Sequence, residues 1–134
     1  MPSHTSLNTF AFSDKIDSKS IHEMYENDLP YIETIFKTIL DHFNEDLSAI
    51  CNGYQQQNLE GLRRSIHKVR PTFGFAGMPG LQEKCREFES KCQAAASINE
   101  IQIDFENLVK DMEEAEAIIK EEYGKLKSFN EAGS

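Results

Sequence analysis

The stretch Ser65-Ile-His-Lys-Val-Arg-Pro-Thr-Phe-Gly-Phe-Ala-Gly77 combines an apolar stripe with one polar edge, and the rest of the chain follows the same pattern. Its apolar residues recur three or four positions apart, which is the spacing of one face of an α-helix. With the residues just upstream, the stripe consists of Leu59, Leu62, Ile66, Val69 and Phe73. Asn58 is a good N-cap residue, so this helix is predicted to run from there to Gly74–Gly77.

Four other segments show helical spacing or helix-start signals. A short helix is predicted over about 21–27, with Ser20 as its N-cap and Glu23 completing a capping box. A long helix should have Pro30 in its first turn and stop at Asn52-Gly53. The last two helices are predicted over about 79–95 and 97–127.

No segment alternates with the period of a strand, and the connections are short. We therefore predict an all-α protein, an antiparallel four-helix bundle with a short extra N-terminal helix. Residues 1–19 are expected to form an N-terminal arm, packed through Phe10 and Phe12. Residues 20–127 would form the bundle, and residues 128–134 a flexible tail.

Composition excludes several classes of function. The 134 residues suit one domain, and a net charge of −9 argues against nucleic-acid binding. No run approaches the ~18 apolar residues of a membrane span, and no secretory signal is recognisable. Cys51, Cys85 and Cys92 match no zinc pattern, so we expect buried reduced thiols in a cytoplasmic protein that acts as a monomer.

The polar edge of the central helix gathers residues that suit phosphoryl chemistry. His67 points roughly 110° away from the stripe centre, and Arg63, Arg70 and Gly74 project on the same side. Neutral imidazole is a nucleophile near pH 7, and arginine cations stabilise the charge of a transferred phosphoryl group. Gly74 would keep the surface low beside the histidine. An exposed histidine near two arginines is also common on helical surfaces, so this pattern alone leaves a purely structural role open.

The other histidines carry weaker signals. His42 lies on a polar face, His22 in the short helix and His4 in the arm, and we predict structural roles for all three. None belongs to a Glu-x-x-His pair of the kind that binds metals in helical bundles. No Gly-rich phosphate loop or kinase motif is present either. We therefore expect no metal, no cofactor and no ATP-dependent catalysis by this chain.

Residues 66–77 resemble the signature of the histidine-containing phosphotransfer (HPt) domain. That signature has a histidine, a Lys or Arg three positions later, and glycines four and ten positions later. On the next helix, Cys85, Phe88 and Glu89 fit the Cys and Leu-Glu pair of the family without a gap. The resemblance covers about residues 20–127 and implies a four-helix bundle with a short extra helix.

The resemblance also implies an activity. His67 would accept a phosphoryl group from the aspartate of one receiver domain and pass it to another, without kinase activity of its own. Arg70 would take the role of the family's basic residue, and Gly77 that of the later glycine. The implied partners are response-regulator receiver domains and a hybrid histidine kinase, with Mg²⁺ only in the receiver. Arg63 and Phe75 are candidate partner-binding residues.

Pro71 departs from the signature, because the family commonly has glycine at this position. Proline has no N–H, so the carbonyl of His67 loses its hydrogen-bond donor and a kink is expected directly after the histidine. Three interpretations stay open: a phosphorelay carrier, a transfer-inactive helical adaptor that binds receiver or kinase domains, and a helical interaction protein whose match to the signature is accidental.

Overall fold

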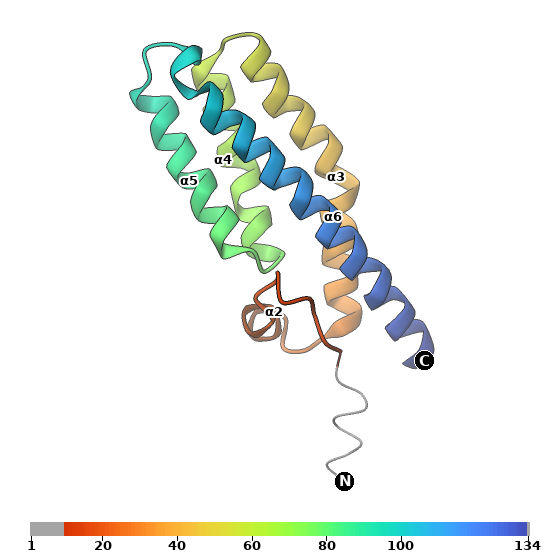
Figure 1. Ribbon diagram of the computed structural model, residues 1–134. Helices are drawn as coiled ribbons and strands as arrows, with labels where there is room; N and C mark the ends of the chain where they lie inside the picture. Colours follow the sequence, from red (N-terminus) through yellow and green to blue (C-terminus); the bar gives the residue numbers. More distant parts are fainter. Residues whose placement is uncertain (1–9, 134) are drawn as a thin grey trace.

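The computed structural model describes residues 10–133 and consists of helices joined by short turns (Figure 1). Its elements are α2 (Ser18–Tyr25), α3 (Leu29–Gln55), α4 (Leu59–Phe75), α5 (Pro79–Ala94), the one-turn 3₁₀-helix η1 (Ile98–Ile101) and α6 (Gln102–Gly133). Helices α3 to α6 run up and down in turn, and α2 lies at the end where α3 and α6 extend beyond α4 and α5. This arrangement confirms the predicted all-α four-helix bundle with a short extra helix.

Most helix starts lie where the sequence signals place them. Asn58 caps α4 by accepting the Gly61 N–H at 2.9 Å, and Pro79 is the first residue of α5. Glu100 accepts the Ser97 N–H at 3.0 Å in the predicted capping box. The prediction for α2 was wrong by one turn, because Asp17 accepts the N–H of Ser20 and starts the helix earlier.

Gly53 does not end α3, contrary to the prediction. The helix continues to Gln55, and the left-handed residue after it is Gln57, with φ of 55°. Gly53 is buried instead, where a Cβ atom would lie 3.1 Å from the Leu62 Cα. The glycine therefore allows the backbones of α3 and α4 to approach closely, and Tyr54 beyond it stacks on Phe105 with ring centroids 4.0 Å apart.

Residues 128–133, which the sequence predicts to belong to a flexible tail, continue α6 as regular helix. Phe129 packs edge-on against Phe10, with ring centroids 5.5 Å apart. The Asn130 amide donates to the Leu29 carbonyl at 3.2 Å and to Glu33 at 2.8 Å. These contacts to distant parts of the chain stabilise a helix end whose own sequence is small and polar. Ser134 lies outside the described residues.

The described part of the N-terminal arm is packed against the bundle through its aromatic residues, as predicted. Phe10 is buried and lies edge-on to Phe12 at 4.8 Å between centroids. The Ser13 N–H donates to Glu122 at 2.8 Å, and Glu122, which is 1% exposed, also pairs with Lys125 at 2.7 Å. A buried carboxylate of α6 thus anchors the arm. Residues 1–9 of the predicted arm lie outside the described residues.

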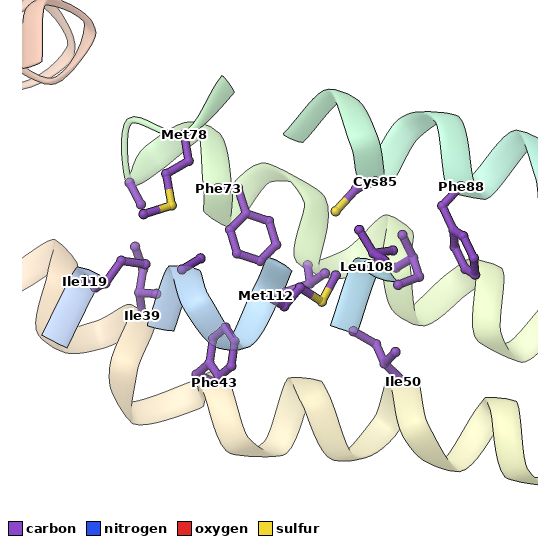
Figure 2. Packing of buried hydrophobic residues seen from close by; sticks show 14 of the residues in the cluster. Ile39, Phe43, Ile50, Phe73, Met78, Cys85, Phe88, Leu108, Met112 and Ile119 are labelled. Atoms are coloured by element: carbon purple, nitrogen blue, oxygen red, sulfur yellow. The ribbon is translucent and has the colours of Figure 1, made fainter. Parts of the chain in front are cut away.

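The core runs the length of the bundle and sets the orientation of α4. Figure 2 shows side chains from α3, α4, α5, α6 and the turn between α4 and α5 that meet in it; those labelled are Ile39, Phe43, Ile50, Phe73, Met78, Cys85, Phe88, Leu108, Met112 and Ile119. Most of the α4 stripe is buried: Leu62, Ile66 and Phe73 are each 0% exposed, while Leu59 at the start of the helix is half-buried. Because this face is fixed, the opposite edge of α4, which carries His67, must face solvent.

The cysteines are free thiols, as predicted, and two of them are buried. Burial is the main cause that raises the pKa of Cys85 to about 12 and that of Cys92 to about 11. Both side chains therefore stay protonated and act as small apolar core residues. None of the helices within residues 10–133 has the length and apolarity that a membrane span requires.

Candidate functional site

His67 lies on the outer edge of α4, beside α5, with 59% of its side chain exposed. Its chain neighbour Ile66 is fully buried, and Val69 is 2% exposed. These two side chains lock the rotation of the helix about its axis. The position of the ring on the surface is therefore a consequence of core packing, as the stripe of the sequence predicts.

The ring of His67 has one polar partner on the neighbouring helix. Its Nδ1 lies 2.8 Å from Oε1 of Glu89, a side chain of α5 that is only 10% exposed. An ionised carboxylate only accepts hydrogen bonds, so this contact assigns the ring hydrogen to Nδ1. The lone pair of a neutral imidazole then resides on Nε2. The contact leaves Nε2 as the nucleophilic atom of the ring.

Arg70 completes a chain of three side chains. Its Nη1 lies 2.9 Å from Oε2 of Glu89, and its own side chain is 27% exposed. Glu89 therefore bridges His67 and Arg70, with one oxygen for each. A carboxylate that is largely removed from water requires such partners, because an unpaired buried charge costs several kcal/mol, on the order of 3–5. The ion pair with the guanidinium orients Glu89 towards the histidine.

Arg63 is occupied by another carboxylate. Glu60 accepts from its Nε at 2.9 Å and from its Nη2 at 2.7 Å, and accepts from Arg64 Nε at 3.2 Å. Hydrogen bonds from both arginines lower the pKa of Glu60 to about 2. Arg63 and Arg70, which are predicted to project on the same side of α4 as His67, are each paired with a glutamate in the structure.

The two predicted glycines lie in different surroundings. Gly74 faces α5, where a Cβ atom would lie 2.7 Å from the Gln82 amide nitrogen, so its surface is covered by that side chain. Gly77 is buried in the turn after α4 and has a left-handed φ of +75°, with a Cβ position 2.7 Å from Ile16. Ten residues of helix and turn, about 15 Å of rise, separate Gly77 from His67. The structure therefore gives Gly77 a place in the fold and no contact with His67.

Helix α4 continues without a break through Pro71 to Phe75. Phe75 is 52% exposed, and its carbonyl accepts the Tyr25 hydroxyl at 2.8 Å. It lies at a groove of about 550 Å³ between α3 and α4, which also contains Lys68 and Thr72. The exposed side of α4 thus offers an apolar ring and a lysine next to the edge that carries His67.

Glu89 is the residue of this site whose role the sequence analysis missed. It appeared there only as one matching position of the resemblance. A signal was available, because Glu89 lies between Cys85 and Cys92 on the apolar face of its helix. A single carboxylate on a stripe that is otherwise buried requires a cation or a donor from a neighbouring helix. Here the His67 ring supplies the donor and Arg70 supplies the cation.

The remaining histidines lie away from this site. His42 lines the α3–α4 groove, and His22 lies edge-on to Phe12 with ring centroids 5.6 Å apart. His4 is outside the described residues. Across residues 10–133, no three His, Cys, Asp or Glu side chains are grouped as a metal site would require.

Comparison with known proteins agrees with this geometry. The family model of the Hpt domain matches residues 34–121, which include α4, α5 and most of α3 and α6. The fold is similar to the crystal structure of the HPT domain from the Hpt sensor hybrid histidine kinase from Shewanella. The two chains are 17% identical with a TM-score of 0.72, over 83% of this chain and 95% of that one. No curated protein matches this chain significantly.

Proposed function

The chain belongs to the Hpt domain family, and from this premise we propose that it is a phosphorelay carrier that works through Nε2 of His67. The phosphoryl group would come from the aspartate of one receiver domain and pass to the aspartate of another. The observation that carries the proposal is the 2.8 Å contact between His67 Nδ1 and Glu89, which leaves Nε2 as the nucleophilic atom of a side chain that is 59% exposed.

The transfer step follows from this contact. The Nε2 lone pair attacks phosphorus, a P–N bond forms, and the P–O bond to the aspartate breaks with its electron pair leaving on the carboxylate. The ring becomes positively charged during the attack, while the Nδ1 hydrogen remains in its hydrogen bond to Glu89. A negative charge 2.8 Å away stabilises that imidazolium. The return step is the reverse, with the ring as leaving group.

Arg70 acts in this scheme by orienting Glu89 and by adding positive charge close to the phosphoryl group. The chain itself would act neither as a kinase nor with a bound cofactor. The Mg²⁺ that phosphoryl transfer to an aspartate requires would be held by the receiver domain. We place the relay in the cytoplasm, which agrees with three cysteines that form no disulfide.

Receiver domains and a hybrid histidine kinase are the partners that this proposal requires. Their docking surface would surround His67 and include Arg63 and the exposed ring of Phe75. Basic residues on α4 complement a carboxylate-rich partner site, although the chain as a whole is acidic. The chain would dock as a monomer, since one α4–α5 edge supplies His67, Glu89 and Arg70 together.

A second candidate function is that of a helical adaptor that binds the same partners without accepting the phosphoryl group. Pro71 favours it, because proline removes the N–H that the His67 carbonyl would bind and crowds that carbonyl. The Nδ1–Glu89 contact remains in place beside this proline. We therefore keep the carrier as the first proposal.

A label-transfer experiment separates the two functions. A receiver domain carrying ³²P on its aspartate is mixed with the chain, and a second receiver without label is then added. A carrier takes up acid-labile, base-stable label and loses it to the second receiver, whereas the His67→Gln variant stays unlabelled. His42→Gln, an exposed histidine of α3, should behave as wild type. A stable complex that forms without label would support the adaptor.

A further inference from the structure

Glu60 occupies two arginines, Arg63 and Arg64, which precede His67 by one helical turn. It binds Arg63 through both of its oxygens, at 2.9 and 2.7 Å, and Arg64 through one, at 3.2 Å. Arg70, the remaining arginine of α4, is bound to Glu89. Every arginine of this helix is therefore paired with a carboxylate before any phosphoryl group arrives.

Helix geometry places Arg63 beneath the ring of His67. Side chains of an α-helix lean towards its N-terminus, so the His67 ring covers the turn that contains residues 63 and 64. Arg63 is one turn before His67, and its side chain is 22% exposed, against 72% for Arg64. The hydrogen bonds with Glu60 are the main cause that raises the pKa of Arg63, and the charge of Glu89 on α5 adds to that effect.

The pairs with Glu60 are easily exchanged. The Glu60 side chain is 53% exposed, and ion pairs at such positions contribute little to stability. A phosphoryl group on Nε2 would bring a charge of nearly −2 and three acceptor oxygens within reach of a helix neighbour four residues away. Because its charge is larger than that of the Glu60 carboxylate, the phosphoryl group can displace Glu60 from Arg63.

We propose that Glu60 is a positioning residue that competes with the phosphoryl group for Arg63 and so sets how strongly His67 retains it. The proposal rests on the carrier function. While Glu60 holds Arg63, the phosphoryl group lacks one stabilising cation and is passed on more readily. Removing the Glu60 charge would release Arg63 and shift the transfer equilibrium towards phosphorylated His67.

The test measures that equilibrium. Each variant is loaded with phosphoramidate, whose P–N bond breaks with release of ammonia as the bond to His67 forms, and is then mixed with one equivalent of unlabelled receiver domain. Glu60→Gln should retain more label at equilibrium, with a shift of about two- to five-fold, the range typical of an exposed ion pair. Asp41→Asn, which removes the exposed partner of Lys37 on α3, serves as the matched control and should leave the equilibrium unchanged.

Double variants show whether the effect passes through Arg63. In an Arg63→Gln background, Glu60→Gln should have no further effect, whereas in an Arg64→Gln background its effect should persist. An equal shift in both backgrounds, or no shift for Glu60→Gln alone, would overturn the role of Glu60 and leave the carrier function intact. A wild-type chain that takes no label from phosphoramidate on His67 would instead overturn the carrier function itself.

Discussion

Replacing Glu89 by alanine is expected to slow phosphoryl transfer to His67 by about 10- to 100-fold, the value of one hydrogen bond to a charged group. The variant loses the acceptor that holds the Nδ1 hydrogen, so the ring can rotate and exchange tautomers. It also loses the negative charge that stabilises the imidazolium during the attack. Single-turnover transfer from a phosphorylated receiver domain measures the rate.

Two variants separate orientation from charge. Glu89→Gln keeps a carbonyl oxygen that can accept from Nδ1, so its rate should lie between those of wild type and Glu89→Ala. Glu87→Ala removes an exposed carboxylate of the same helix and should transfer at the wild-type rate. Circular dichroism checks that each variant is folded. If Glu89→Ala and wild type transferred equally fast, the proposed role of the Nδ1 contact would be wrong.

Replacing Gly77 by alanine is expected to lower the free energy of unfolding by about 2–5 kcal/mol. A left-handed conformation costs a residue with a Cβ atom about 1–2 kcal/mol, and overpacking of a filled site costs about 1–3 kcal/mol more. Both terms apply, because φ is +75° and the new Cβ would lie 2.7 Å from Ile16 and 2.8 Å from Ile21. Urea denaturation followed by circular dichroism gives the difference.

Gly80→Ala is the matched control for this prediction. Gly80 lies three residues further on, in the first turn of α5, and a Cβ atom there has no heavy atom within 4 Å. Its effect on stability should stay within about 0.5 kcal/mol. The result also decides between two roles of Gly77. If Gly77 is required at the phosphoryl site, Gly77→Ala would slow transfer without loss of stability. If its role is structural, Gly77→Ala would lower stability and leave the transfer rate of the folded protein unchanged.

The helices could be predicted because their signals are local. The apolar stripe of α4 and the caps at Asn58 and Pro79 each depend on residues within one or two turns. The ends that the sequence did not predict depend on contacts from other parts of the chain. Gly53 has the sequence of a helix stop, yet close packing on Leu62 keeps it helical. Residues 128–133 look like a fraying tail, yet they pack on the arm and on α3.

The candidate site shows the same difference between features set by local sequence and features set by distant contacts. The exposure of His67 follows from the stripe, but the partner of its ring lies 22 positions away on α5. Periodicity within one helix cannot tell which side chain of the next helix faces it. Two carboxylates stand on otherwise apolar stripes, Glu89 on α5 and Glu122 on α6. Glu89 binds His67, and Glu122 anchors the N-terminal arm. A charged residue on an otherwise buried stripe was therefore the most informative unused signal for contacts between distant parts of the chain.

The central claim is that the phosphoryl group is bound to Nε2 of His67, because Nδ1 is committed to Glu89. Phosphorus-31 and nitrogen-15 NMR of the chain, labelled with ¹⁵N-histidine and loaded with phosphoramidate, tests it most directly. We predict one phosphohistidine, with phosphorus coupled to the Nε2 of His67 and hydrogen retained on Nδ1. Phosphorus on Nδ1, or a phosphohistidine signal that persists in the His67→Gln variant, would contradict the claim.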